Sequence, residues 1–403
     1  MRIAIVQETV DVARGGAETA TSEMARHLAA LGLDVSLVCS GGRSEACDLE
    51  GVALRPIPAR GPTRAWRTYQ FVQAVNRLCH QERFDIVHAI TPCPAADVYQ
   101  PRAGTYSETV ARNLVRIRGP VRRHLSRLGR YFNVRQRFLM HLEQTLLRKR
   151  RQRLFVAAIS DYVRRQVMAY GFPAERTRLV YNAVDVTWLP PQQAADCRTT
   201  VRAGLGVADG VPLLLFAAHN FKLKGLAELL HGCAMLNRMG HAGWRLAVAG
   251  RGKPGAYRRL AWLLGLAEQV SFVGPVADMA SWYAAADLLV HPTWYDPCSR
   301  VVLEAVSLGL PVVTTRHNGA AEVIKPGRQG EVIDSPADPV ALAGALTRAL
   351  RPEVRAACRR DAEQLREYLS MARHARELKA LYEEIAGEKG AAGRGLRGAA
   401  CGR

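Results

Sequence analysis

Short apolar runs alternate with stretches of helical periodicity through the first part of the chain. Between the first two runs, Met24, Leu28 and Leu31 recur at helical spacing and Gly32 follows, which predicts a helix over residues 17–31. The apolar runs have the length and composition of buried strands. The expected strands of this part are residues 3–6, 34–39, 84–90 and 154–159.

The same alternation begins again in the second part of the chain. A helical pattern then continues over residues 338–385. Strands that alternate with helices predict α/β units with parallel sheets covered on both faces. The expected strands here are residues 212–217, 245–249, 270–273, 288–291, 311–314 and 330–333.

A chain of 403 residues exceeds the size of one ordinary hydrophobic core, so two domains are expected. Residues 179–184 and the proline-containing stretch 190–193 resemble a connection. We therefore predict two Rossmann-like domains, 1–185 and 186–385, and a disordered Gly-, Ala- and Arg-rich tail over 386–403. Ligands of such sheets bind beyond the carboxyl ends of the strands, which favours a site in a cleft between the domains.

Composition narrows the class of protein. Hydrophobic residues make up 48% and charged residues 23%, as in globular proteins. The run 211–218 is much shorter than the roughly 20 residues that cross a bilayer. The first residues resemble a strand rather than a secretory signal, and the nine cysteines form no C-x-x-C pair. We therefore expect a cytoplasmic protein with reduced thiols and without a zinc site.

Positive charge is concentrated in one segment. The formal net charge is +20, and residues 112–153 carry fourteen Arg or Lys against the single acid Glu143. Such a block favours an anionic partner. No nucleic-acid module accompanies it, so an anionic membrane or a phosphorylated glycolipid is the better expectation. A coding bias toward arginine is the alternative explanation.

The segment 295–305 holds the strongest chemical signal. Asp296 and Glu304 lie eight positions apart, and Pro297 argues against one continuous helix through both. A loop carrying Asp296, followed by a helix that begins near Ser299 or Arg300, fits better. The first amides of that helix, with Ser299, Arg300 and Val301, would face an anion, and Glu304 could accept hydrogen bonds from a ribose. The alternative is an ordinary loop before a buried helix, with both acids solvated.

Further candidates follow other expected strands. Gly15 and Gly16 would let a phosphate approach a helix start. Lys222 and Lys224 would stabilise charge on a leaving diphosphate. His88 ends a strand and is a candidate contact for the transferred group. A tight turn, a solvated lysine pair and a structural histidine are the respective alternatives.

Several short segments follow one another along the chain: 14–18, 85–88, 182–185, 224–225, 272–274, 285–292 and 296–304. Taken in order, they resemble family 4 of the retaining nucleotide-sugar glycosyltransferases, and the resemblance extends to about Ile333. It implies the GT-B fold of two facing Rossmann-like domains. Within the family the chain looks most like enzymes that glucosylate heptose in the lipopolysaccharide core. The stretches that support this narrower resemblance are 98–99 with Tyr106 and Glu108, Phe221 before residues 224–225, and 285–292.

The resemblance also implies roles for residues. Glu304 would bind the donor ribose, Asp296 would lie near the sugar hydroxyls, and Lys224 with the Gly15–Gly16 loop would lie near the diphosphate. The first acid of the family's E-x7-E pattern is here an aspartate, and His219 or Asn220 stands where an arginine is usual, so Lys222 is a candidate for the missing charge. No metal or cofactor is implied.

The expected function is therefore retaining transfer of a hexose, glucose from UDP-glucose, to a glycolipid or lipopolysaccharide-core acceptor. The enzyme would lie on the inner face of the membrane through residues 112–153, with no nucleic-acid partner. Two alternatives stay open: a non-catalytic anion- or membrane-binding protein, and a nucleotide-sugar epimerase of the same fold.

Overall fold

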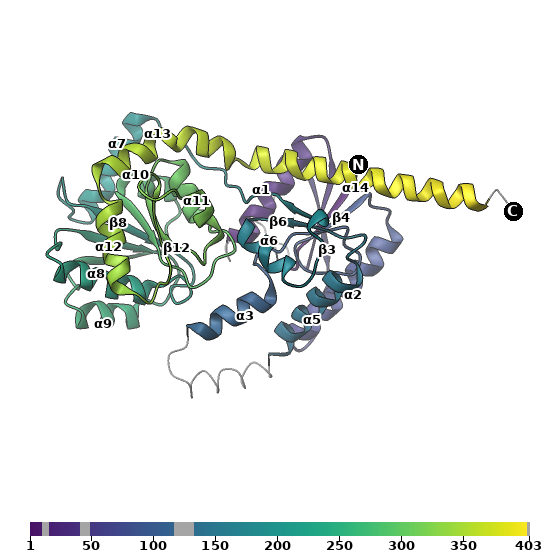
Figure 1. Cartoon of the computed structure of the whole chain (residues 1–403), viewed down its shortest axis with the longest axis horizontal. Helices are drawn as coiled ribbons and strands as arrows, with labels where there is room; N and C mark the ends of the chain where they lie inside the picture. Colours follow the sequence, from purple (N-terminus) through teal and green to yellow (C-terminus); the bar gives the residue numbers. More distant parts are fainter. Residues whose placement is uncertain (10–15, 41–48, 117–132, 401–403) are drawn as a thin grey trace. The chain divides into compact units, whose positions relative to one another are not determined.

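The computed structural model describes residues 1–9, 16–40, 49–116 and 133–400, the last nine as backbone only. Contacts divide the chain into two compact units (Figure 1). The first unit comprises Met1–Asn182 and Met371–Arg403, and the second comprises Ala183–Ser370.

The first unit is built on a seven-stranded sheet with the order β3-β2-β1-β4-β5-β6-β7. All neighbouring strands pair in parallel, as the alternation predicted. The interior strands are buried along most of their length, which matches their apolar sequences. The strands are β1 (Arg2–Val6), β2 (Asp34–Ser40), β3 (Val52–Ile57), β4 (Ile86–Ala89), β5 (Val98–Tyr99), β6 (Phe155–Ala158) and β7 (Thr177–Leu179).

Helices connect and cover these strands. Several begin at a side-chain cap, as at Thr63, Thr105 and Ser160, whose hydroxyls accept a backbone N–H of the first turn. The helices of the first unit are α1 (Gly16–Ala30), α2 (Arg64–Gln81), α3 (Tyr106–Val115), α5 (Val134–Lys149), α6 (Asp161–Met168), the short 3-10 turn η2 (Ala174–Arg176) and α14 (Met371–Ala400).

The second unit contains a six-stranded parallel sheet with the order β10-β9-β8-β11-β12-β13. All six strands expected from the sequence are present. They are β8 (Leu213–Ala217), β9 (Arg245–Ala249), β10 (Val270–Gly274), β11 (Leu288–His291), β12 (Val312–Thr315) and β13 (Gly330–Ile333).

Helices lie around this second sheet, and the apolar faces of α8 and α12 join its core (Figure 1). The helices are α7 (Pro191–Gly204), α8 (Leu226–Arg238), α9 (Gly255–Leu263), α10 (Met279–Ala285), α11 (Arg300–Ser307), the 3-10 turn η3 (Gly319–Val323), α12 (Pro339–Ala349) and α13 (Pro352–Tyr368). The predicted fold class, two Rossmann-like α/β domains with parallel sheets, is confirmed.

The C-terminal helix differs from the expectation. The segment 371–385 was assigned to the second domain, but α14 belongs to the first unit, and the first unit ends at residue 182 rather than 185. Tyr382 of α14 bonds to His88 of β4, and Lys389 pairs with Asp97 at 2.8 Å. These contacts attach the helix to the first sheet.

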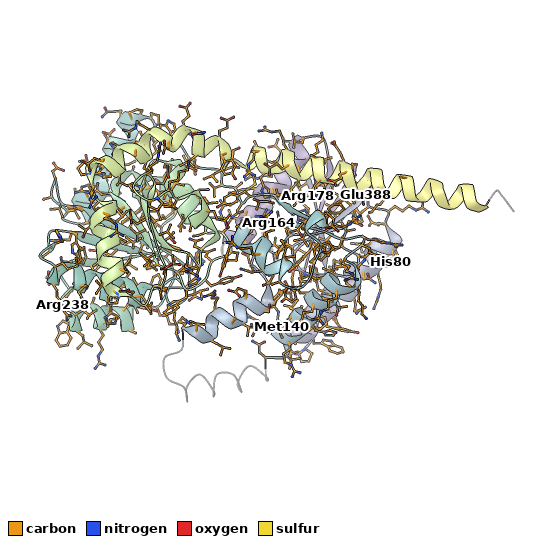
Figure 2. The ribbon with its side chains drawn as sticks, in the orientation of Figure 1. His80, Met140, Arg164, Arg178, Arg238 and Glu388 are labelled. Atoms are coloured by element: carbon orange, nitrogen blue, oxygen red, sulfur yellow. The ribbon has the colours of Figure 1, made fainter. Side chains whose placement is uncertain are left out.

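The expected disordered tail is also helical in this structure as far as Ala400, and residues 401–403 lie outside the described part. The glycines of this segment disfavour helix, so contacts rather than intrinsic propensity account for its helical start. Arg176 donates to Glu388 at 3.0 Å, an ion pair between η2 and α14 (Figure 2 labels Glu388). Contacts with the first unit therefore hold the start of segment 386–403, which its composition predicted to be disordered.

Candidate functional site

Three loops of the second unit follow the carboxyl ends of neighbouring strands. Lys224 follows β8, Asp296 follows β11 and Asn318 follows β12. In a parallel sheet these ends lie at one edge, which is where open α/β sheets bind ligands. The structure joins the three loops through hydrogen bonds and one ion pair.

The ion pair is between Lys224 and Asp296. The Nζ of Lys224 lies 2.5 Å from Oδ2 of Asp296, and both side chains are mostly buried. His291, at the end of β11, places Nε2 at 3.6 Å from the same oxygen. The loop carboxylate is therefore held by a cation and a ring nitrogen, and is not solvated as the alternative interpretation required.

This environment fixes the ionisation of the cluster. Burial would raise the pKa of Asp296, but Lys224 and His291 outweigh it and hold that pKa well below its usual value. Burial lowers the pKa of His291, and the charge of Lys224 adds to that effect, while Asp296 opposes it. At neutral pH the cluster therefore contains a carboxylate, an ammonium and a neutral imidazole.

The backbone of Asp296 is anchored as firmly as its side chain. Its N–H donates to the carbonyl of His317 at 2.9 Å, and its carbonyl accepts the N–H of Gly319 at 2.9 Å. The N–H of Cys298 donates to Oδ1 at 3.3 Å. The position of the carboxylate thus depends on the loop after β12 as well as on its own loop.

Gly225 explains why a glycine follows Lys224. Its φ of +80° is left-handed, and a Cβ there would lie 2.1 Å from the carbonyl oxygen of Pro292. The backbone after β8 therefore passes directly against the loop after β11. Thr293 strengthens this contact, since its hydroxyl donates to the carbonyl of Leu223 at 3.2 Å. The close approach brings Lys224 to Asp296.

Helix α11 begins at Arg300 with Ser299 as its N-cap, as predicted. The Ser299 hydroxyl makes no capping bond and lies instead 3.3 Å from Nε2 of His291. The amide oxygen of Asn318 accepts the N–H of Ser299 at 3.1 Å. Among the described residues no acceptor is bonded to the N–H of Val301, so a donor at this helix start stays available to an anion.

Glu304 lies one turn into α11 and is held from two sides. The hydroxyl of Tyr283 on α10 donates to Oε2 at 2.7 Å, and Nη2 of Arg300 lies 3.5 Å from Oε1. Burial and then the neighbouring carboxylate raise the pKa of Tyr283 well above its usual value, so its hydroxyl stays protonated and donates. Glu304 is partly exposed and can accept further hydrogen bonds.

Sequence reasoning missed two residues of this site. Asn318 connects the helix start to the loop after β12, also accepting the N–H of Ala320 at 3.0 Å. Tyr283 orients Glu304 from another helix. Neither belongs to a local pattern with Asp296 or Glu304, so only the fold brings them together. An Asn followed by Gly319 after an apolar strand was the available signal for the first.

The other predicted residues lie elsewhere. Lys222 is exposed and has no ion pair within the described residues, so the structure does not bring it into the cluster. Burial, assisted by the charge of Arg251, lowers the pKa of the neighbouring His219. Gly16 begins α1 in the first unit, and Gly15 lies outside the described residues.

His88 does not have the geometry of a catalytic contact. It is 0% exposed in the first unit, and Nδ1 lies 2.5 Å from the hydroxyl of Tyr382 on α14. Burial, with the nearby charge of Arg102, lowers the pKa of His88 to about 3. The side chain connects β4 to α14 as a neutral ring. The expectation that it touches a substrate is replaced by a structural role.

Two further features are absent from the described part of the chain. There, no group of three or more His, Cys, Asp or Glu could hold a metal ion. Across the same residues, no helix is long and apolar enough to cross a membrane.

Comparisons with known proteins agree with this architecture. Residues 14–188 match the family model described as Glycosyltransferase Family 4, and residues 211–352 match the one described as Glycosyl transferases group 1. Lipopolysaccharide glucosyltransferase WaaG of Escherichia coli K12 is 27% identical over 280 residues, which span 70% of this chain and 72% of WaaG. A D-inositol 3-phosphate glycosyltransferase of Thermomonospora curvata is 32% identical over 50% of this chain and 49% of its own length.

Solved structures share the fold. A crystal structure of WaaG superposes with a TM-score of 0.74 at 23% identity, covering 94% of this chain and 99% of WaaG. HepE of Anabaena in complex with UDP-glucose gives 0.71 at 18% identity, covering 95% and 100%. The fold and the two family matches define a glycosyltransferase of the GT-B type. The chain belongs to family 4 of the glycosyltransferases, as its sequence motifs indicated, and it is similar to WaaG.

Proposed function

We propose that this glycosyltransferase moves a hexose, glucose from UDP-glucose, with retention of configuration to a glycolipid or lipopolysaccharide-core acceptor. The observation that carries the proposal is the Lys224–Asp296 pair beside the start of α11, with Glu304 one turn inside the helix. The similarity to WaaG supports the acceptor class, and the UDP-glucose complex of HepE supports the donor.

The diphosphate of the donor would lie between Lys224 and the first amides of α11. An ammonium and the positive end of a helix both favour negative charge. Charge on the diphosphate grows as the bond to the sugar breaks, so groups already fixed in place stabilise the transition state more than the bound donor. The burial of Lys224 and its bond to Asp296 supply that fixed geometry.

The ribose would be held by Glu304. A carboxylate accepts hydrogen bonds from two neighbouring hydroxyls, and Tyr283 and Arg300 keep this carboxylate in one orientation. These partners occupy part of its accepting capacity and leave the rest for the donor.

Asp296 would have two tasks in this scheme. It positions Lys224, and it places a carboxylate near the sugar hydroxyls. Aspartate is one methylene shorter than the glutamate usual at this position. Its contacts to Lys224, His291 and Cys298 hold the carboxylate close to the sheet edge.

In the reaction, the acceptor hydroxyl forms a bond to the anomeric carbon on the face from which the UDP leaves. The bond from that carbon to the diphosphate oxygen breaks, and the proton of the attacking hydroxyl passes to that oxygen. The protein contributes orientation and charge stabilisation and need supply no nucleophile of its own. We propose that Lys224 and the α11 amides supply this charge stabilisation and that the enzyme needs no metal ion or cofactor.

Membrane attachment is part of the proposal and is supported by the first unit. Helices α2 and α5 pack together and carry three neighbouring aromatic rings. The exposed Trp66 and Tyr69 lie 5.8 Å apart, and Tyr69 lies 5.8 Å from the half-buried Phe138. A groove of about 450 Å³ on α5 is lined by Phe138 and five neighbours, which include Arg137 and Met140 (Met140 is labelled in Figure 2). Aromatic rings beside basic residues suit the interface of an anionic membrane. We place the enzyme on the cytoplasmic face.

A thermal shift screen with nucleotide-sugars tests the donor assignment. UDP-glucose should raise the melting temperature of the native protein, because a ligand that binds only the folded form stabilises it. Incubation with UDP-glucose alone separates the alternatives: conversion of the donor to another nucleotide-sugar without an acceptor would mean an epimerase. Vesicle binding without any turnover of nucleotide-sugars would mean a non-catalytic protein.

A further inference from the structure

The second unit contains a cavity on the side of its sheet away from Lys224 and Asp296. Its volume is about 420 Å³, and residues of α7, α10 and α13 line it. Asp287 and Pro311, which also line it, come just before β11 and β12. The cavity is therefore at the amino ends of the strands, whereas Lys224 and Asp296 follow the carboxyl ends.

Arginines outnumber carboxylates around this cavity. Oδ1 of Asp287 lies 2.7 Å from Arg198 and 2.9 Å from Arg355, and Oδ2 lies 3.2 Å from Arg202. Arg202 is also bonded to the carbonyls of Ala208 and Val211, so it has a structural role. Arg198 and Arg355 are partly exposed at the cavity wall. One carboxylate thus faces three guanidinium groups.

A fourth arginine has no such partner. Arg359 lines the cavity from α13, and within the described residues it makes no ion pair. Burial lowers the pKa of Arg355; Asp287 opposes the effect, and Arg359, Arg198 and Arg202 reinforce it. The guanidinium groups are therefore close enough to repel one another. An added anion would relieve that repulsion.

The remainder of the wall is largely apolar. Trp188 is 54% exposed and is fixed by Arg366, whose guanidinium lies 4.2 Å from the ring centroid. Leu308, Leu310 and Pro311 contribute aliphatic surface. A cavity of a few hundred Å³ with apolar walls and a few convergent charges has the features of a small-molecule site.

Tyr283 connects this cavity to the donor site. Tyr283 is one of the residues that line the cavity, and its hydroxyl donates to Glu304 at 2.7 Å. A ligand that shifts this residue changes the group that orients Glu304.

We propose that the cavity binds a small organic anion, a phosphate or carboxylate head on an aromatic or aliphatic body. The head contacts Arg355 and Arg359, and the body lies against Trp188 and Pro311. The ligand then alters donor affinity through Tyr283; this link, unlike the site itself, rests on the proposed function.

Titration calorimetry with 1-naphthyl phosphate tests the site. Arg359→Gln should weaken binding about tenfold, because a charge-assisted hydrogen bond is lost. Arg360→Gln is the matched control: Arg360 is exposed on the same helix, does not line the cavity, and should leave the affinity unchanged. Arg359→Gln keeps the ion pairs of Asp287, and circular dichroism melting verifies its fold.

Three results would overturn the site. The first two are equal affinities of the two variants for naphthyl phosphate, and binding of naphthyl phosphate no tighter than that of neutral 1-naphthol. The third is complete loss of naphthyl phosphate binding under saturating UDP, which would assign that binding to the donor site. Dihexanoyl phosphatidic acid as a second probe separates two sources of the anion. Tighter binding than naphthyl phosphate indicates a lipid head, and weaker binding indicates a free metabolite.

The link needs a separate measurement. Saturating naphthyl phosphate should change the Kd of wild-type protein for UDP severalfold, and UDP should change that of naphthyl phosphate by the same factor. Tyr283→Phe should abolish both effects. An unchanged affinity for UDP overturns the link alone. If UDP does not bind at all, this counts against the proposed function. Binding of naphthyl phosphate that depends on Arg359 would still establish the cavity as an anion site.

Discussion

Lys224 and Asp296 form an ion pair at 2.5 Å between loops that follow two different strands of the second sheet, β8 and β11. Both groups are mostly buried, and Asp296 stays ionised because Lys224 and His291 outweigh the cost of burial. The pair fixes the ammonium before any ligand arrives. A fixed cation loses less side-chain entropy on binding a diphosphate than a free surface lysine would.

Removing this ammonium should affect the reaction strongly. Lys224→Ala is expected to lower kcat/KM for sugar transfer by about 100- to 1000-fold, the usual size of a lost transition-state charge contact. The melting temperature should also fall, since the Asp296 carboxylate loses its partner. Lys222→Ala is the control, because Lys222 is exposed. Equal losses for the two variants would contradict the assignment of Lys224.

The depressed pKa of Asp296 predicts a dependence of stability on pH. Its pKa is below the unfolded value of about 3.9, so the contribution to stability is complete above that pH and is lost as the pH falls through the folded value. Asp296→Asn should remove this dependence. Urea unfolding between about pH 6 and pH 2.5 should therefore show a flatter free energy of unfolding for the variant in the acid range. If the free energy of unfolding varied with pH in the same way for both proteins, this would count against a buried, paired Asp296.

The roles of Glu304 and Tyr283 predict graded losses of nucleotide affinity. Glu304→Gln should weaken UDP binding about tenfold, since a neutral amide replaces a charged acceptor. Tyr283→Phe should cause a smaller loss, because the carboxylate is retained but less well oriented. Titration calorimetry with UDP measures both. Undiminished binding to Glu304→Gln would show that the ribose lies elsewhere.

The aromatic and basic surface of the first unit predicts salt-dependent membrane binding. Vesicles with anionic lipid should bind the protein, and raising the salt concentration should release it. Replacing Arg148 and Lys149 by glutamine should weaken binding by about 1 kcal/mol per residue. Trp66→Ala should weaken it too.

The matched control for Trp66 is Trp262→Ala. Trp262 is 68% exposed but lies on α9 of the second unit, so its loss should leave vesicle binding unchanged. Binding that ignores both salt and the Trp66 substitution would assign the basic segment another purpose.

The sequence predicted the second sheet well because each of its strands is a compact apolar run between polar loops. It predicted the first sheet less completely. Strand β5 is only two residues long, and edge strand β3 is largely exposed and contains Pro56, so neither leaves a clear pattern. Asp296, Lys224 and Glu304 became candidates because their neighbours form recognisable motifs, and the structure pairs Lys224 with Asp296.

Other features depended on contacts that no local pattern reveals. Asn318 and Tyr283 reach the site from loops and helices distant in sequence. His88 was misassigned because a histidine at a strand end has the same sequence signal whether it faces a ligand or packs beneath a helix. Only the position of Tyr382 on α14 decides between these possibilities.

Sugar transfer itself provides the most direct test. Wild-type protein, UDP-glucose and a lipopolysaccharide-core acceptor lacking its glucose should be incubated, and the anomeric configuration of the product determined by NMR. We expect an α-linked glucose, because the donor is an α-anomer and the configuration is retained. A β-linked product, or conversion of the donor without transfer to any acceptor, would contradict retaining glucose transfer.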